Sequence, residues 1–369
     1  MVSPVSVTAC PSATSEPNKG TRWLATHAGT TAALAIFSVL LPVSILVAIG
    51  LGPAVIHPVD TARYLWAAVT SGTITADEVT RYQIIWQIRT PRVLLAAVVG
   101  AGLSAVGVAI QTLVRNALAD PYILGVSSGA SVGAVLINTF GALGFLGIYA
   151  VTGGAFAGAL IAAVLVYAIA YGRMGTTPLR LVLTGVALSF GFQAIMSLII
   201  YYAPTGEATS AVLFWTMGSF GAARWGSLPI VAAAIIIGIV ILHRFSRPLD
   251  IMSFGDETAA SVGFDANELR RVLFVLTAVM TGAMVAVSGA IGFIGLVTPH
   301  IVRILFGASH ARVLLIAPLV GATLMIWVDL ISRTLVAPRE LPLGVITALV
   351  GVPVFIILMR RRGYIFGGR

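Results

Sequence analysis

Long apolar runs dominate this chain, and nearly all of its charged residues lie in the gaps between them. Charged residues make up only 9% of the sequence and hydrophobic residues 58%, whereas about a quarter of the residues of a water-soluble domain are charged. The apolar runs are about 20 residues long, which is the length that a helix needs to cross the hydrocarbon core of a bilayer. The sequence therefore predicts an all-α protein that crosses a membrane many times.

Hydropathy predicts about ten membrane-spanning helices in a single domain, residues 29–362. Residues 1–28 are rich in Ser, Thr, Pro and Ala and are expected to form a disordered tail, and residues 363–369 form a second, short tail. The stretch 203–226 is expected to hold at most a short helix that does not cross. The expected spans are residues 30–51, 93–113, 124–142, 148–171, 180–202, 228–243, 271–289, 291–306, 313–332 and 343–359.

The basic residues between the spans favour one orientation of the chain. With the N-terminus in the cytoplasm, fifteen of the 22 basic residues face the cytoplasm and seven face the opposite side, as the positive-inside rule requires. Both tails and the longest polar loop, residues 244–270, are then cytoplasmic. The cytoplasmic set is Lys19, Arg22, Arg115, Arg173, Arg180, Arg244, Arg247, Arg270, Arg271, Arg303, Arg312, Arg360, Arg361, Arg362 and Arg369. The opposite set is Arg63, Arg81, Arg89, Arg92, Arg224, Arg333 and Arg339.

Missing residue types exclude several classes of function. A phosphate-binding P-loop needs a lysine after its glycines, and the only lysine is Lys19 in the tail, so this chain is not expected to hydrolyse ATP by that route. Cys10 is the only cysteine, which excludes an internal disulfide and a multi-cysteine metal site. The net charge of +9 reflects topology and attraction to anionic lipid, because no basic stripe or aromatic platform is arranged for nucleic acid.

Acidic residues are scarce inside the expected spans, where Asp329 is the sole candidate and lies near the end of its span. Secondary transporters driven by protons or sodium usually keep ionisable or unwound polar sites at the membrane midplane. If this protein moves a solute uphill, the energy is therefore expected to come from another chain.

The first informative stretch is R-T-P-R at residues 89–92, which opens an expected span. Thr90 suits the N-cap of that helix and Pro91 its first helical position. Two arginines at a helix N-terminus oppose the helix dipole, and no acidic residue occurs between Glu78 and Asp120 to neutralise them locally. The arginines are interpreted either as anchors to lipid headgroups or as a docking site for carboxylates of an external partner.

Polar residues inside the spans are the candidates for a solute path. Gln111 is a lone amide late in an apolar span, and it either lines a path or only hydrogen-bonds a neighbouring helix. Thr298 and Pro299 follow a glycine-rich stretch, and Pro299 is expected to kink its helix. The adjacent His300 is interpreted as a structural histidine, because no second metal ligand is spaced to join it.

The loop of residues 244–270 is expected to contain a short helix. Asp256 suits the N-cap of this helix, Glu257 its first turn and Gly263 its C-terminal stop. Asp265 then begins a capping-box-like start to the next span. A helix of about two turns is not stable alone in water, so it needs a surface to pack on, which either a cytoplasmic partner or the span ends of the same chain provide.

Together these stretches resemble the permease subunits of the iron-siderophore, haem and cobalamin ATP-binding-cassette (ABC) importers, the FecCD-type family. The resemblance covers nearly everything from Arg89 to Arg362, and two departures are visible: Ala117 stands where the family usually has proline, and Thr298 where an apolar residue is common. The motifs, in order, are R-T-P-R, Q-x3-R-N-x-L-A-x-P-x2-L-G-x-S-x-G-A, W-x-x-G-S at Trp215 to Ser219, G-D-E-x-A-x-S-x-G, G-F-I-G-L-x-x-P-H-x-x-R and E-L-P-L-G.

The resemblance implies a subunit of ten helices like the cobalamin-importer permease, a type II ABC importer, in the cytoplasmic membrane of a bacterium. It also implies three kinds of protein partner: a second permease subunit, identical or paralogous, two ATPase subunits that bind Mg-ATP, and an extracytoplasmic substrate-binding protein. No cofactor, metal or catalytic residue is expected in this chain itself.

The resemblance also assigns roles to particular residues. Arg89, Arg92 and Arg333 match outer-face arginines that receive glutamates of the binding protein, so Arg333 is expected to serve docking rather than to pair with Asp329. The short loop helix matches the element that couples the permease to the ATPase, with Gly255, Asp256, Glu257, Ala259, Ser261 and Gly263 as its residues. The expected translocation path includes Gln111, Ser128, Thr298 and Pro299.

A ferric siderophore is the expected cargo, because it is the commonest cargo of the family. Cobalamin and haem are alternatives, since none of the path residues separates these ligands. An ion-driven secondary transporter is disfavoured by the scarcity of membrane-embedded acids, and a membrane enzyme by the lack of a nucleophile–base pair or metal cluster.

Overall fold

The computed structural model describes residues 26–172, 175–203 and 216–361, and this part of the chain is all-helical. Most of the two tails, Arg362 and Trp215 of the W-x-x-G-S motif lie outside the described residues. The α-helices are α2 (His27–Gly50), α3 (Pro58–Thr70), α4 (Val79–Gln83), α5 (Thr90–Leu113), α6 (Val126–Phe140), α7 (Ala150–Ala170), α8 (Pro178–Tyr201), α10 (Leu228–Arg244), α11 (Ser246–Ser253), α12 (Asp256–Ser261), α13 (Ala266–Ser288), α14 (Ile294–Phe306), α15 (His310–Thr334) and α16 (Leu343–Arg361). The π-helix η1 (Ile84–Arg89) and the 3-10 helices η2 (Pro121–Leu124) and η3 (Gly144–Tyr149) join them.

Each of the ten expected spans overlaps one of these α-helices. Six continuous helical stretches are long and apolar enough to cross a bilayer, or seven if α10 and α11, which meet at an angle of 60°, form one broken span. The other three, α6, α14 and α16, are shorter apolar helices. With 13 residues, α14 is about 20 Å long, less than the ~30 Å hydrocarbon core. The fold class is confirmed, and the count of ten crossings stays a prediction.

The R-T-P-R stretch lies inside a continuous helix rather than at the start of one. The helix that begins at Val79 runs through the π-helical turn η1 into α5. Thr90 is not an N-cap, because its hydroxyl donates to the carbonyl of Ile85 (2.7 Å). Pro91 has no N–H and its ring crowds the preceding turn, so the wider π-helical turn just before it relieves a clash that a regular helix would meet.

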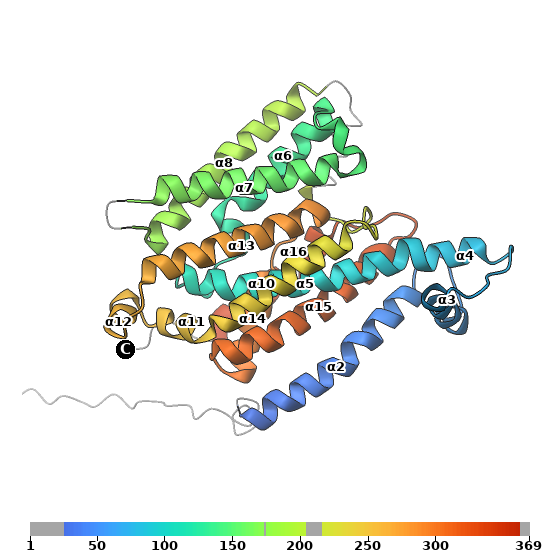
Figure 1. Cartoon of the computed structure of the whole chain (residues 1–369), viewed down its shortest axis with the longest axis horizontal. Helices are drawn as coiled ribbons and strands as arrows, with labels where there is room; N and C mark the ends of the chain where they lie inside the picture. Colours follow the sequence, from blue (N-terminus) through green and yellow to red (C-terminus); the bar gives the residue numbers. More distant parts are fainter. Residues whose placement is uncertain (1–25, 173–174, 204–215, 362–369) are drawn as a thin grey trace, which may run out of the picture.

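The helices lie roughly alongside one another in Figure 1, where α6, α7 and α8 form one side of the molecule and α2 the opposite edge. Between them, α5 packs against α15, α13, α14, α10 and α2, and it is buried along most of its length. By contrast, only 6% of the apolar span of α8 is buried within the chain. An apolar helix exposed to this extent is expected to contact lipid or another subunit.

The two ends of the bundle carry different elements (Figure 1). One end, here called the α12 end, consists of α11, α12 and the start of α13, and the other, the α3 end, of α3, α4 and residues 335–342. Arg115 and Arg270 contact Asp256 at the α12 end, whereas Arg92 contacts Glu340 at the α3 end. The structure thus separates these arginines into the two groups that the charge pattern predicted.

Glycines let two pairs of helices approach closely. A Cβ atom on Gly133 of α6 would lie 2.1 Å from the carbonyl oxygen of Gly154 on α7, and one on Gly158 would lie 2.3 Å from that of Gly129. Between α5 and α15, a Cβ on Gly100 would lie 2.2 Å from the carbonyl oxygen of Gly321. Small residues at such positions are typical of packed membrane helices.

Candidate functional site

At the α3 end, Arg92 joins α5 to α15 and to the segment that follows α15. Its Nε donates to Oδ1 of Asp329 (2.8 Å), and its two terminal nitrogens donate to the two oxygens of Glu340 (2.7 and 3.1 Å). The side chains of Arg92 and Asp329 are 7% and 0% exposed. A bidentate pair of this kind fixes orientation as well as charge. Arg92 therefore holds residues 335–342 against the start of α5.

Two further arginines of this end donate hydrogen bonds to backbone carbonyls at the C-terminal end of α2. Arg89 donates to the carbonyl oxygens of Ile49 (3.2 Å), Gly50 (2.8 Å) and Ala54 (2.5 Å), which satisfies acceptors that the end of a helix leaves unpaired. Arg333 donates to the carbonyl of Ala48 and lies 3.3 Å from Oδ2 of Asp329 through its Nε. Arg89, Arg92, Asp329, Arg333 and Glu340 are called the buried cluster below.

The three arginines expected to receive glutamates of a binding protein lie inside the fold, and their docking role stays a prediction. Arg89, Arg92 and Arg333 are only 4%, 5% and 3% exposed, and each is occupied by groups of its own chain. Arg333 is an ion-pair partner of Asp329 after all, since the i, i+4 spacing of α15 places the two side chains on one face. The burial arises because α2, α5 and α15 converge around the three guanidinium groups. Glu340, which sequence reasoning left unassigned within E-L-P-L-G, is the acid that it missed.

Other basic residues of the α3 end do reach the surface. Arg81, Arg224 and Arg339 are exposed, and none of them forms an ion pair with another described residue. Arg63 is also exposed but is paired with Asp60 and Glu78. The Arg63 guanidinium, by its hydrogen bond, holds the pKa of the Glu78 carboxyl below its usual value. The three unpaired arginines leave positive charge available at this surface.

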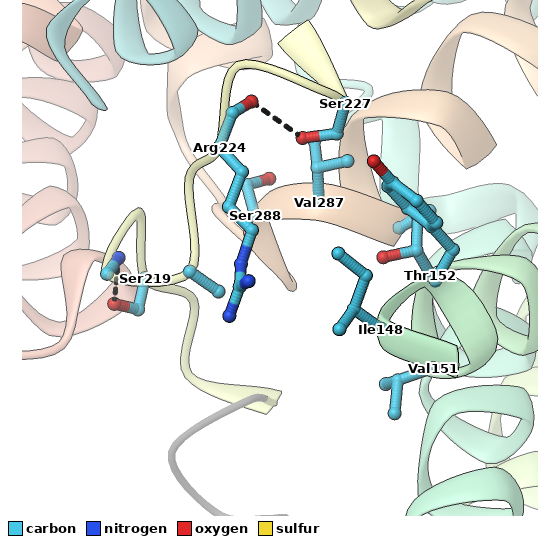
Figure 2. A pocket seen from close by; sticks show the side chains of 12 residues that line it. Ile148, Val151, Thr152, Ser219, Arg224, Ser227, Val287 and Ser288 are labelled. Carbon is cyan, nitrogen blue, oxygen red and sulfur yellow. Dashed lines mark hydrogen bonds between the residues drawn. The ribbon is translucent and has the colours of Figure 1, made fainter. Parts of the chain in front are cut away.

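Arg224 lies at a cavity of about 410 Å³ between η3, the start of α7, the end of α13 and the segment before α10. Figure 2 shows its side chain extending between Ser219 on one side and Ile148 on the other. The wall combines apolar side chains with hydroxyl groups, and several of these are already used: Ser227 donates to the carbonyl of Arg224, and Ser288 to that of Met284. Arg224 thus supplies the charged group among the residues that line the cavity.

At the α12 end, Asp256 fastens the short helix to the body of the protein. Its carboxylate accepts from Arg270 (2.9 and 3.0 Å) and from Arg115. Arg270 is 1% exposed and also donates to the carbonyl of Thr176 (2.6 Å). The short helix exists as expected, but its N-cap is Gly255, and Asp256 is its first residue. Asp256 binds the two arginines instead of capping the helix. Sequence reasoning missed this role because Arg115 is 141 residues away and Arg270, at 14 residues, lies beyond the reach of a local capping pattern.

The outer surface of α12 stays open. Glu257 and Ser261 are exposed, whereas Ala259 is buried against the protein. Large apolar side chains precede and follow the helix in sequence and are also exposed: Phe254 is 75% and Val262 55% exposed. Gly263 ends the helix region with a φ of +83°, as expected for a helix stop. Asp265 caps α13 as predicted, accepting from the backbone N–H of Asn267 and Glu268.

The expected path residues are mostly internal to the chain. Gln111 is 0% exposed, accepts from Arg303 and donates to the carbonyls of Gly295 and Leu296, so it joins α5 to α14. Thr298 and Pro299 are buried in α14, and Ser128 is half-buried with its hydroxyl bonded to the carbonyl of Gly125. The hydrogen bonds of Gln111 to α14 confirm the second interpretation of this residue, a bond to a neighbouring helix. A place on the path for Ser128, Thr298 and Pro299 stays a prediction.

An apolar hollow lies elsewhere, along α16. A cavity of about 610 Å³ is bordered by the first half of α16, by Met217 and by Ala290. Its walls are glycine, alanine, valine, leucine and proline side chains with one threonine. His300, for comparison, is buried in α14, and no group of three potential metal ligands occurs among the described residues.

Two motifs that are distant in sequence are tied together by Asp120 and Tyr122. Asp120 caps η2 by accepting from the N–H of Tyr122 (2.9 Å) and also accepts from the N–H of Phe293 (3.3 Å). The Tyr122 hydroxyl accepts from the N–H of Ile291 (2.8 Å). Burial raises the pKa of the Asp120 carboxyl. The break between α13 and α14 is thus held by the turn that follows α5.

Nearly the whole chain is similar to known proteins. The model of the FecCD transport family matches residues 40–361. The hemin transport system permease protein HmuU of Yersinia pestis is 38% identical, with 86% of this chain and 93% of that protein covered. The cobalamin import system permease protein BtuC of Halobacterium salinarum is 37% identical, over 76% and 74%. A solved structure of an ABC transporter assigned to the metal-chelate type, in an inward-facing conformation, superposes with a TM-score of 0.77 at 32% identity and covers 89% of this chain and 99% of that one.

Proposed function

This chain belongs to the FecCD transport family of multi-pass membrane permeases, which are non-enzymatic subunits of ABC transporters, and we propose that it imports a ferric siderophore. The observation that carries the proposal is the similarity over almost the full length to a transporter of the metal-chelate type. The substrate-binding protein and the ATPase of such a transporter are separate chains. Mg-ATP is then bound by the ATPase and not by this permease.

The apolar hollow along α16 supports the proposal of a cargo path with few polar contacts. Such walls offer a bulky chelate weak, non-directional contacts, so selectivity belongs to the binding protein and the permease acts as a gated conduit. Because α8 is exposed along its apolar length, we assign this helix and α16 to contact with the second permease subunit. The path then lies between the two subunits, whereas Gln111 lies inside one subunit.

The orientation follows from the two ends of the bundle. We place the α12 end in the cytoplasm against an ATPase, with Glu257, Phe254 and Val262 as contact residues, because a short helix with exposed apolar neighbours needs a covering surface. The α3 end then faces the binding protein. There we assign docking to the exposed Arg81, Arg224 and Arg339 rather than to the buried cluster.

Haem and cobalamin are the second candidate cargoes, and the names of the two relatives compared above favour them. The deciding experiment uses the complete importer, with its own binding protein and ATPase, in proteoliposomes. Uptake of a radiolabelled ferric siderophore, haem and cobalamin is measured with and without ATP on the side of the membrane where the ATPase lies. ATP-dependent uptake of the siderophore is expected. Uptake of haem or cobalamin alone would correct the cargo, and no ATP-dependent uptake of any of the three would reject a chelate importer.

A further inference from the structure

An Asp–His–Thr arrangement at the α12 end, in which the histidine and the threonine are buried, joins three helices. Nδ1 of His310 lies 2.6 Å from Oδ1 of Asp250, and the same oxygen accepts from the backbone N–H of His310 (2.9 Å). Nε2 of the ring lies 2.7 Å from the hydroxyl of Thr112. His310 is 3% and Thr112 0% exposed. Since a carboxylate only accepts, Nδ1 carries a proton, and the orientation of the ring is determined from both sides.

The three residues come from elements with different positions in the molecule. Asp250 belongs to α11, which leads directly into α12, whereas His310 is the first residue of α15 and Thr112 lies in the last turn of α5. The carboxylate of Asp256 in α12 pairs with Arg115 and Arg270. The Asp250–His310–Thr112 link is therefore a direct polar connection from the segment carrying α12 to both α5 and α15.

Helices α5 and α15 also contact each other at two other positions along their length. Gly100 and Gly321 are in close backbone contact in the middle, and Arg92 pairs with Asp329 at the α3 end. With 25 residues, α15 is about 37 Å long. Contacts at both ends and in the middle make the two helices one rigid body that reaches from the α12 end to the buried cluster.

We propose that the Asp250–His310–Thr112 link is a positioning device that makes the α5–α15 body move with α11 and α12. The proposal rests on the function proposed above, in which α12 contacts the ATPase. Movement of α12 on ATP binding is then passed through Asp250 to His310 and Thr112, and the buried cluster shifts at the far end.

Two substitutions of His310 separate the two halves of the link. The amide nitrogen of His310→Asn replaces Nδ1 and keeps the bond to Asp250, whereas that of His310→Gln replaces Nε2 and keeps the bond to Thr112. His310→Gln is expected to lower cargo transported per ATP hydrolysed at least fivefold in the reconstituted importer. His310→Asn is expected to lower this ratio less than threefold. His243→Gln, on α10 at the same end and outside the link, is the matched control and should leave the ratio unchanged.

A distance measurement supplies a readout that simple destabilisation would not change. In a Cys10→Ser background, spin labels at Ser261→Cys and Thr334→Cys report α12 and the end of α15, each relative to a label at Tyr171→Cys. ATP is expected to move both labels in the native sequence and only the α12 label with His310→Gln. If both labels still move, or if the transport ratio is unchanged, the link is structural only. If the native importer shows no ATP-dependent uptake at all, the proposed function fails instead.

Should His310→Gln fail to assemble with the ATPase, Thr112→Val replaces it, because valine has the same shape without the hydroxyl. With normal assembly, the transport ratio is then expected to fall about two- to threefold, which lies between the native protein and His310→Gln. A ratio equal to that of the native protein would overturn the proposal.

Discussion

Among single residues, Arg92 has the greatest influence on the architecture of the α3 end. It is buried between Asp329 and Glu340, two acids that lie 237 and 248 residues further along the chain. An isolated buried charge is costly to desolvate, whereas a paired and hydrogen-bonded one is tolerated. Arg89 and Arg333 depend in the same way on backbone carbonyls of α2. These arginines therefore stabilise the fold before they contribute to any interaction with a partner.

Arg92→Ala is expected to destabilise the protein by about 3–5 kcal/mol, because it leaves the fully buried Asp329 without its closest partner. Thermal unfolding of the detergent-solubilised protein is the measurement. Adding Asp329→Asn should restore part of the loss, since the uncompensated charge is removed. Arg81→Ala, an exposed arginine of the same end, is the control and should melt within a degree of the native protein. Equal melting of Arg92→Ala would show that the pair contributes nothing.

At the scale of elements, backbone contacts and short helices have separate roles. The α6–α7 and α5–α15 pairs depend on glycines whose missing side chains allow the helices to touch. The short α12 depends on charge, because Asp256 is its fastening to Arg115 and Arg270. Its outer surface, with Glu257, is free of such contacts. Attachment to the protein therefore depends on Asp256, and the neighbouring Glu257 remains available for the partner contact proposed above.

Gly133→Ala is expected to cost about 1–3 kcal/mol, the range for overpacking in a close-packed interior. The added methyl group would meet the backbone of α7, which cannot move aside as a flexible side chain can. Gly191→Ala is the matched control, because a Cβ there has no neighbour within 4 Å in α8. Melting temperatures of the two variants should differ clearly. The same melting temperature for both would contradict close contact between α6 and α7.

Charge reversal in α12 should distinguish its two acids. Glu257→Lys is expected to weaken association with the ATPase while the melting temperature of the permease stays unchanged, because Glu257 is exposed. Asp256→Lys should lower both, since it places a positive charge beside Arg115 and Arg270. Co-purification with the ATPase and thermal unfolding give the two readouts. Normal association of Glu257→Lys would remove that residue from the contact surface.

For the whole molecule, the separation of charge and apolar surface between the ends and the sides is the main feature. The sides of α2, α8 and α16 are apolar and exposed, which suits lipid and a second subunit. The α3 end combines a buried, internally paired set of charges with exposed arginines around it. Exposed charges steer a partner and set its register more than they add affinity.

Docking of the binding protein at the α3 end should therefore depend on salt. Each exposed charge pair contributes only about 0.2–1 kcal/mol, so affinity should fall several-fold between low and high salt. Arg224→Glu combined with Arg339→Glu should weaken binding more than the two alanine changes do. Arg247→Glu, at the α12 end, is the control. Affinity measured by surface plasmon resonance that responds neither to salt nor to the double reversal would remove these arginines from the interface.

The sequence alone was sufficient for features that depend on neighbouring residues. Apolar runs of the right length predicted the helices, and the basic residues between them predicted which arginines lie at the same end of the bundle. Asp265 and Gly263 predicted a helix start and a helix stop. These predictions succeeded because hydropathy and capping act over a few residues. Ordered motifs likewise identified the family. Because the motifs identified the family, the function was predictable at the level of an ABC permease.

Only the tertiary structure decided which polar groups are buried and what they bind. Arg333 was expected at the surface and is paired with Asp329. For Gln111 the sequence left open a place on the path or a bond to a neighbouring helix, and the structure shows that it joins α5 to α14. Asp256 was expected to cap its helix and instead binds two arginines. Exposure and pairing depend on how helices far apart in sequence converge, as for the 237 residues between Arg92 and Asp329. A local pattern contains no information about that convergence, so these roles became clear only once the helices were packed.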